Sequence, residues 1–176
     1  MSAGAPAPGE EGLAELHARL RRVEDELAIR RVVLAYGPAA DSGSTTLAAS
    51  AWLEDGDYDW DAAAEPHRGR TGVEAMLRSD GHQSLVSGGI AHFAGPPLVE
   101  LDGDRATPLT YSLIMRRDAE GDRFYLWRVS AARWDLERAG TSWRVRRRTN
   151  RLLDETGAGR ELMVTLTQEM FGGEIS

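Results

Sequence analysis

The chain contains no cysteine, and this absence removes several kinds of chemistry at once. Disulfide bonds, thiolate nucleophiles and thiolate metal sites are all excluded. Histidine is scarce as well: only four occur in 176 residues, and they are too scattered to predict a zinc site. No apolar stretch approaches the roughly 20 residues that span a bilayer, so we expect no membrane segment. Residues 1–12 also lack the basic start and apolar stretch of a signal peptide, and we therefore expect a cytoplasmic protein.

Positive charge is in short supply. The chain has 21 Lys and Arg against 28 Asp and Glu, which gives a formal net charge of -7. Phosphate binding needs a basic surface, so nucleic acid is not expected as a partner. One local exception is the run of arginines within residues 144–151. Alternate residues of a strand face opposite ways, so this run divides between two faces and is expected to be solvated.

The remaining composition is that of a soluble globular protein, with 41% hydrophobic and 28% charged residues. The length suffices for one domain with a buried core. Residues 1–12 are rich in Ala, Pro, Gly and Glu and predict a disordered tail. Residues 13–155 are expected to form the domain, with an extended N-terminal helix. Residues 156–176 predict a helical extension that covers a pocket mouth or packs on a partner subunit.

The N-terminal helix carries a single apolar stripe, with spacings of three, four, three and four residues. Its members are Leu13, Leu16, Leu20, Val23 and Leu27. This stripe is narrow enough for a helix–helix seam as well as for a core face. An apolar face continues to Tyr36, and Pro38 is expected to kink or end the helix there.

The rest of the chain predicts short helices followed by a run of strands. Helices are expected near Thr45 and from Gly72 to Arg78, with an alternating strand at residues 57–61 between them. Strands are then expected at 91–101 (broken by a Pro-Pro pair), 105–117, 123–137 and 143–153, before a last helix at 160–171. This order predicts an α+β fold in which a curved antiparallel sheet wraps around the N-terminal helices and leaves a conical cavity. Such a cavity suits a small molecule.

Three polar residues are candidates for chemistry in that cavity: Tyr36, Asp41 and His92. A carboxylate and an imidazole together form a general base, and a tyrosine hydroxyl can donate a proton. Each also has a structural interpretation. Asp41 can cap a turn, Tyr36 can belong to the core, and His92 can be a satisfied strand residue. Two other histidines, His67 and His82, lie in polar segments and are expected at the surface.

An acidic stretch imitates a calcium-binding loop without being one. Asp55, Asp57, Asp59 and Asp61 alternate like calcium ligands. Such a loop needs Gly and Glu at the positions that Trp60 and Pro66 occupy. We therefore interpret this stretch as an acidic strand edge, and no metal site is predicted.

Several segments, taken in order, resemble one family. Residues 23–30, running on to Tyr36 and Asp41, resemble the opening of SnoaL-like proteins of the nuclear transport factor two-like superfamily. His92 and its neighbour, followed by residues 98–106, resemble the first long strand and hairpin of that family. Residues 133–136 with 143–145 and Arg148 resemble its closing hairpin. The resemblance covers roughly residues 20–154.

The family includes scytalone dehydratase, bile-acid dehydratases, hexachlorocyclohexane dehydrochlorinase, ketosteroid isomerase and polyketide cyclases. Resemblance to the dehydratase and dehydrochlorinase branch implies that Asp41 orients His92 and that the pair abstracts a proton. Tyr36 matches the tyrosine of the bile-acid dehydratases, and Arg148 falls where the dehydrochlorinase has an active-site arginine. In this interpretation Arg148 contacts substrate. Five aromatic residues are expected to line the pocket or fill the core: Tyr58, Trp60, Phe93, Trp127 and Trp134.

The sequence thus predicts a lyase that dehydrates a small cyclic, polyketide or steroid-like substrate without a metal or organic cofactor. An isomerase or cyclase that uses the same dyad stays open as an alternative. A non-catalytic ligand-binding or assembly module is a third. The expected partners are a small apolar or polycyclic molecule and further copies of the chain, in a dimer or trimer.

Overall fold

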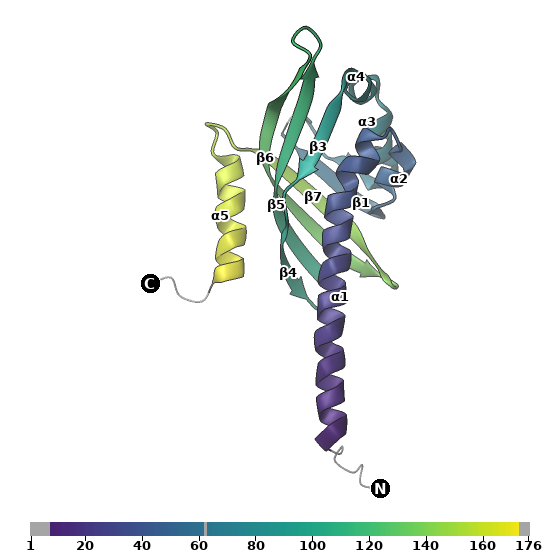
Figure 1. Cartoon of the computed structure of the whole chain (residues 1–176), viewed down its shortest axis with the longest axis vertical. Helices are drawn as coiled ribbons and strands as arrows, with labels where there is room; N and C mark the ends of the chain where they lie inside the picture. Colours follow the sequence, from purple (N-terminus) through teal and green to yellow (C-terminus); the bar gives the residue numbers. More distant parts are fainter. Residues whose placement is uncertain (1–7, 62, 173–176) are drawn as a thin grey trace.

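The structure, a computed structural model, describes residues 8–61 and 63–172. A long helix, four shorter helices and a strongly curved sheet make up the described chain (Figure 1). None of these helices combines the length and apolarity that crossing a membrane requires.

Helix α1 (Pro8–Asp41) is the longest element, and its N-terminal half projects beyond the sheet (Figure 1). It begins inside the segment expected to be a disordered tail; residues 1–7 of that segment lie outside the described residues. Of the two expected effects of Pro38, a kink or the end of the helix, the second was wrong, because the helix continues to Asp41. Leu34 and Pro38 both lie on an exposed side of the helix. Water can therefore reach the Leu34 carbonyl, which lacks its intrahelical donor at Pro38.

The other elements follow the predicted order closely. The helices are α2 (Thr45–Ala49), α3 (Gly69–Arg78), α4 (Asp80–Gly88) and α5 (Ala158–Phe171). The strands are β1 (Trp52–Trp60), β2 (His67–Arg68), β3 (Ile90–Ala94), β4 (Leu98–Asp102), β5 (Arg105–Asp118), β6 (Arg123–Ala139) and β7 (Ser142–Leu152). Helix α4 was not predicted.

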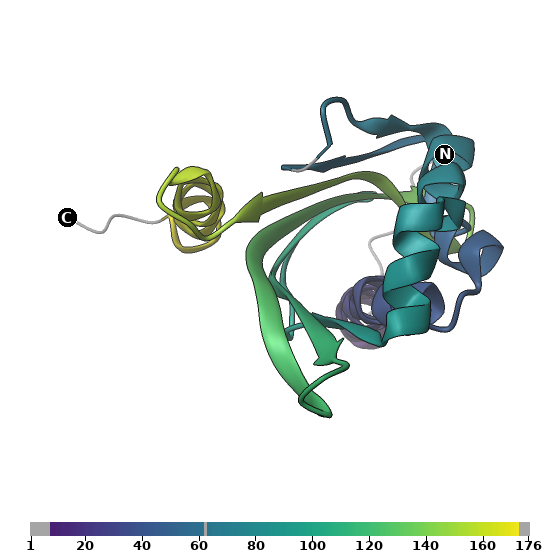
Figure 2. The same ribbon diagram turned by 90° about the horizontal axis from the view of Figure 1, so that it is seen from above.

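The strands form one mixed sheet in the order β2-β1-β7-β6-β5-β3, with β4 also paired to β5. Most neighbours are antiparallel, as expected, but β1 and β7 run parallel, which corrects the prediction of a purely antiparallel sheet. The parallel pair arises because the chain reaches β1 from the helices rather than through a hairpin with β7. Seen from above, the sheet curves around α1, with α3 and α4 closing the open side (Figure 2).

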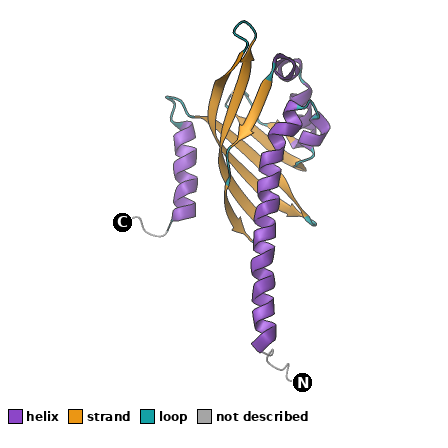
Figure 3. Cartoon of the chain, viewed as in Figure 1, coloured by secondary structure: helices purple, strands orange, loops and turns teal. Residues whose placement is uncertain are grey.

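Helices and strands are segregated as an α+β fold requires (Figure 3). Helix α1 buries Ile29, Val33, Tyr36 and Ala40, which recur every three or four residues and face the concave sheet. Helix α5 packs instead against β6 and β7, with Leu166 buried. It lies within the extension expected at residues 156–176, of which residues 173–176 are outside the described residues, and none of the residues described for this segment lines the cavity below.

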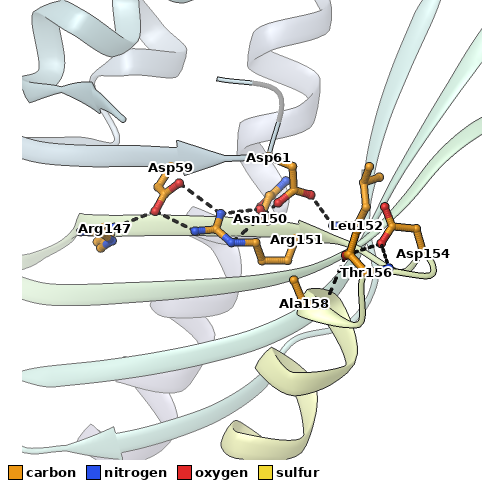
Figure 4. A network of polar contacts seen from close by, with 9 residues as sticks. All are labelled: Asp59, Asp61, Arg147, Asn150, Arg151, Leu152, Asp154, Thr156 and Ala158. Carbon is orange, nitrogen blue, oxygen red and sulfur yellow. Dashed lines mark hydrogen bonds and ion pairs between the residues drawn. The ribbon is translucent and has the colours of Figure 1, made fainter. Parts of the chain in front are cut away.

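The arginines of β7 pair with the acidic strand β1, which the parallel register places alongside (Figure 4). Asp59 is the centre of this network: its carboxylate accepts hydrogen bonds from Arg147 at 2.7 Å and Arg151 at 2.9 Å. Asp55 forms a 2.6 Å ion pair with Arg146 nearer the start of the strand. The arginine run is therefore not a solvated basic face, because carboxylates of β1 neutralise much of its charge.

Replacing Asp59 by Asn tests this network. Hydrogen bonds from Arg151 and Arg147 hold the pKa of Asp59 below its ordinary value of about 3.9. The resulting stabilisation is therefore complete above that value and is lost as pH falls through the lower native pKa. We expect Asp59→Asn to reduce the free energy of unfolding by about 1 kcal/mol at pH 7. The difference should shrink below about pH 4, as measured by urea unfolding.

The control is Asp55→Asn, which breaks an ion pair whose carboxylate is largely exposed. Exposed pairs contribute little, so no measurable change is expected there. Equal losses in both variants, or a loss in Asp59→Asn that persists at low pH, would contradict the network's role.

Gly37 determines how closely α1 approaches the sheet. A Cβ atom at this position would overlap the carbonyl oxygen of His92 in β3. Only glycine therefore allows the two backbones to meet at this point. The close approach brings the C-terminal end of α1 to β3.

We expect Gly37→Ala to destabilise the protein by roughly 1–3 kcal/mol, because helix and strand must separate to admit the methyl group. Gly12→Ala is a matched control in the same helix, where an added Cβ meets no described atom within 4 Å. That change should stabilise the helix by about 0.5–1 kcal/mol. Thermal unfolding measures both. A stabilisation shared by the two variants would mean that helix propensity, not the contact with β3, governs position 37.

Candidate active site

The end of helix α1 meets strand β3 through a two-point contact between Asp41 and His92. One Asp41 carboxylate oxygen accepts a hydrogen bond from the His92 backbone N–H at 2.7 Å. The other lies 2.5 Å from Nδ1 of the His92 ring. The side chains are only 20% and 15% exposed, so water competes little for the contact. The structure thus brings together two of the residues singled out from the sequence.

This contact decides which ring nitrogen of His92 is available. A carboxylate only accepts hydrogen bonds, so the proton shared with Asp41 resides on Nδ1. In the neutral ring Nε2 then carries a lone pair, and Nε2 is the atom that can take a proton. Asp41 also lies where it stabilises the imidazolium that such a transfer forms. The pair is thus arranged as a general base.

Tyr36 lies one and a half helical turns before Asp41, within an aromatic cluster. Its ring centre is 6.3 Å from that of His92 and 5.4 Å from that of Trp52. Burial raises the pKa of Tyr36 well above the ordinary tyrosine value. The hydroxyl therefore stays protonated at neutral pH and is a hydrogen-bond donor.

Arg148 lies behind this cluster rather than in the cavity. Its guanidinium carbon is 4.4 Å from the ring centre of Tyr36, 4.7 Å from that of Tyr58 and 4.3 Å from that of Trp134. The residue is 3% exposed, and Nη2 donates to Ser112 at 3.3 Å. Among the described residues Nε and Nη1 find no hydrogen-bond partner. The aromatic faces therefore hold this buried cation, and its charge lowers the cost of negative charge on Tyr36.

A cavity of about 340 Å³ opens in front of His92 between the sheet and helices α3 and α4. Tyr36 and His92 form part of its wall. Tyr58, Trp60 and Trp127 also line it, as the sequence interpretation expected. The cavity is mainly apolar with a few convergent polar groups, which is the usual character of a small-molecule site.

Two residues predicted to contact substrate do not line the cavity. Phe93 is 51% exposed, because successive strand residues face opposite sides and His92 takes the inner side. Arg148 is separated from the cavity by the Tyr36 and Tyr58 rings that it contacts. A direct contact of either side chain with bound substrate therefore finds no support in the geometry.

The sequence interpretation missed His82, which it placed at the surface. His82 lies in the first turn of α4 and lines the cavity together with Leu85. Its ring stacks at 17° to that of His92, with centres 6.0 Å apart. Both ring nitrogens are buried, and neither has a hydrogen-bond partner among the described residues. Two sequence signals bracket the helix: Ser79, whose hydroxyl accepts from the backbone N–H of His82, and a glycine pair after the last turn.

His67 also differs from its expected surface position. It is partly buried in β2, and its Nε2 lies 3.3 Å from the indole nitrogen of Trp60. His67 does not line the cavity itself. Its hydrogen bond therefore bears on the site only by fixing the orientation of Trp60.

The described residues contain no cluster of three or more His, Cys, Asp or Glu side chains that could hold a metal ion. A wider groove of about 810 Å³ borders the opposite side of Tyr36, between α1, α2 and the β6–β7 turn. Neither Asp41 nor His92 lines that groove. The smaller cavity is thus the one that His92 lines, with Asp41 hydrogen-bonded behind its ring.

Comparison with known structures agrees with this architecture. An NTF2-like protein with a cystatin-like fold from Novosphingobium aromaticivorans is 40% identical, with a TM-score of 0.82 over 86% of this chain and 96% of that one. A protein of unknown function from Mycobacterium tuberculosis is 21% identical, with a TM-score of 0.66 over 89% and 82% of the two chains. A candidate scytalone dehydratase from N. aromaticivorans is 14% identical, with a TM-score of 0.63 over 76% and 87%.

No curated protein matches the sequence. The family model of the SnoaL-like domain matches residues 21–149, which include the contact between Asp41 and His92 and all seven strands except the last residues of β7. The chain therefore belongs to the SnoaL-like family of NTF2-like proteins.

Proposed function

We propose that the protein is a lyase that removes water from a small cyclic substrate held in the 340 Å³ cavity, without a cofactor. The observation that carries this proposal is the two-point contact of Asp41 with the backbone and the ring of His92. A capping or purely structural aspartate does not need to hold both groups of one histidine. The SnoaL-like family, which includes dehydratases and polyketide cyclases, supports the same assignment.

Nε2 of His92 would remove a proton from the carbon next to a substrate carbonyl. The electron pair of that C–H bond forms a C=C double bond, and hydroxide leaves the neighbouring carbon. The His92 imidazolium formed in this way would then give the proton to the leaving hydroxide, so that water is the product and His92 is neutral again. Asp41 stabilises the imidazolium form of His92 while the proton resides on Nε2.

Two groups are placed to donate hydrogen bonds to substrate oxygens. Tyr36 stays protonated because it is buried, and the charge of Arg148 lowers the cost of its donating toward a developing enolate. His82, whose nitrogens lack partners among the described residues, faces the same cavity from α4. A neutral imidazole has one N–H, and this N–H can donate a hydrogen bond that orients the departing hydroxyl while the His92 imidazolium protonates it. In this proposal Arg148 acts through Tyr36 rather than by touching substrate.

An isomerase or cyclase would use the same base and the same enolate-stabilising donor. The two reactions part after proton removal: a lyase expels a leaving group, whereas an isomerase returns the proton to another carbon. The paired cavity histidines, His92 and His82, favour the lyase, because expulsion of hydroxide is helped by a hydrogen-bond donor beside the group that protonates it. A non-catalytic binding module would need the cavity but not the dyad.

The test uses 3-hydroxy-1-tetralone, a bicyclic β-hydroxy ketone whose dehydration yields 1-naphthol and is followed by fluorescence. We expect turnover by the parent protein and a loss of kcat on the order of 10²–10⁴-fold in His92→Gln and Asp41→Asn. Tyr36→Phe should lower kcat as well. Tyr111→Phe is the matched control, since Tyr111 is 54% exposed on β5 and should keep full activity. Circular dichroism establishes that each variant is folded.

The same reaction run in D2O separates the alternatives. Exchange of the proton next to the carbonyl without naphthol formation would contradict the lyase and favour an isomerase or cyclase. Saturable binding of the ketone with neither exchange nor naphthol would leave only the binding module. Turnover that survives in both dyad variants would contradict the assignment of the base.

The titration of His82 tests whether its ring is neutral, as proposed for the group that donates a hydrogen bond to the leaving hydroxyl. Burial lowers the pKa of His82, and the neighbouring His92 ring lowers it further. The unfolded chain takes up this proton near pH 6.5 and the native state only at lower pH, so stability should decline as pH falls below about 6.5. We expect an NMR midpoint for His82 below 6.5. We also expect His82→Gln to lose less stability than the parent between about pH 7 and pH 5. A midpoint at or above 6.5 would contradict a neutral His82.

A further inference from the structure

The apolar stripe of α1 has no partner in the described chain. Its side chains are exposed by 57% at Leu13, 57% at Leu16, 50% at Leu20, 54% at Val23 and 58% at Leu27. Figure 1 shows that this part of α1 extends past the sheet. Exposed apolar residues in a continuous row mark an interaction site more often than scattered ones do.

The stripe lies on the opposite side of the helix from the core. The buried face of α1 begins at Ile29 and continues through Val33 and Tyr36. Ile29 follows Leu27 by two residues, which is a rotation of about 200° around a helix of 3.6 residues per turn. The domain therefore occupies one side of α1, and the stripe faces away from it. A second helix can lie along the stripe without meeting the domain.

We propose that the stripe pairs with the same stripe of a second copy of this chain, in a parallel two-stranded coiled coil. The spacing places Leu13, Leu20 and Leu27 at a positions and Leu16 and Val23 at d positions of a heptad. The positions on either side of the stripe from residue 17 to residue 26 are charged or polar: His17, Arg19, Glu24 and Glu26. An apolar face only a and d wide accommodates one partner helix.

The flanking charges complement a second copy in the parallel orientation. In a parallel pair each g position faces the e position five residues later on the other helix. Arg19 (g) then faces Glu24 of the partner subunit, and Glu26 (g) faces Arg31 of the partner subunit. Each pairing occurs twice by symmetry and joins opposite charges. Arg19, Glu24 and Arg31 are all exposed in the single chain and free to reach across.

The parallel register also pairs every apolar residue of the stripe with another apolar residue. Every apolar layer from Leu13 to Leu27 then meets its own counterpart. An antiparallel pair that matches Leu20 with Val23 of the partner subunit instead places Leu13 against a charged residue, Arg30. In the parallel pair Arg30 follows the last layer, and its charge is neutralised within its own helix by Glu26 at 2.6 Å. The parallel arrangement brings the two cavities to the same end of the assembly, since Asp41 ends the same helix.

A single engineered cysteine tests the pairing in the full-length protein, because the chain has no cysteine of its own. In a parallel coiled coil Leu13→Cys places two thiols opposite each other within disulfide range. Mild oxidation should then convert most of the protein to a covalent dimer. In the antiparallel register described above the two thiols would be about 25 Å apart, so no such dimer could form.

Ala18→Cys is the control, since Ala18 lies in the same exposed half of α1 but on the opposite side from the stripe. It should give no more than slow, concentration-dependent crosslinking. Equal crosslinking of the two variants, or none at position 13, would overturn the proposal. These readouts do not involve the cavity, so they stand whatever the proposed activity turns out to be.

Sedimentation of Leu20→Glu provides a second, independent measure. Two like charges at the centre of the seam should separate the helices, and the native mass should fall by half relative to the parent. Arg19→Glu should weaken association, and Arg19→Glu combined with Glu24→Arg should restore it. A parent protein that is monomeric, or a mass unchanged by Leu20→Glu, would overturn the proposal and point to a different occupant of the stripe.

Discussion

The contact between Asp41 and His92 is the constraint on which the rest of the site depends. It fixes the C-terminal end of α1 against β3, because the carboxylate holds both the backbone N–H and the ring of one residue. It also selects the tautomer that directs a basic nitrogen into the cavity. One carboxylate therefore joins the helix to the strand and, in the proposed function, forms half of a general base. The close approach of the two backbones at Gly37 allows Asp41 to reach His92.

The buried charge of Arg148 lies behind the cavity and acts on the same site through the ring of Tyr36. Arg148 sits among three aromatic rings with no carboxylate partner in the described part of the chain. A buried cation that faces no anion is costly unless it is stabilised by aromatic faces and compensated by nearby negative charge. Negative charge that develops at Tyr36 or on a bound oxygen would supply that compensation during a reaction. The neighbouring arginines of β7 differ, because Asp59 already neutralises them at the surface.

The fold was predicted from patterns along the chain, whereas the pairing of Asp41 with His92, 51 residues apart, was predicted from the family resemblance. The helical spacing of α1 and the order of the strands are visible in the chain, and so is the position of Asp41 at a helix end. The effect of Pro38 on the end of the helix was not predicted correctly. The free-energy cost of a proline inside a helix depends on whether water reaches the carbonyl that it leaves unpaired, and only the packing reveals this. His82 was missed because α4 is short and rich in Gly and Ser, so no periodicity announces it. Phe93 was expected at the pocket or in the core. Successive strand residues face opposite sides of the sheet, so Phe93 points away from the cavity because His92 points toward it.

The most direct test of this account is the tautomer of His92, read from long-range ¹H–¹⁵N correlation spectra of the protein at neutral pH. The account predicts a ring protonated at Nδ1, with a strongly deshielded proton shared with Asp41 and an Nε2 shift typical of an unprotonated nitrogen. In Asp41→Asn the deshielded proton should disappear. A His92 ring protonated at Nε2 alone, or a spectrum unchanged by Asp41→Asn, would contradict the central claim that Asp41 orients His92 as a base.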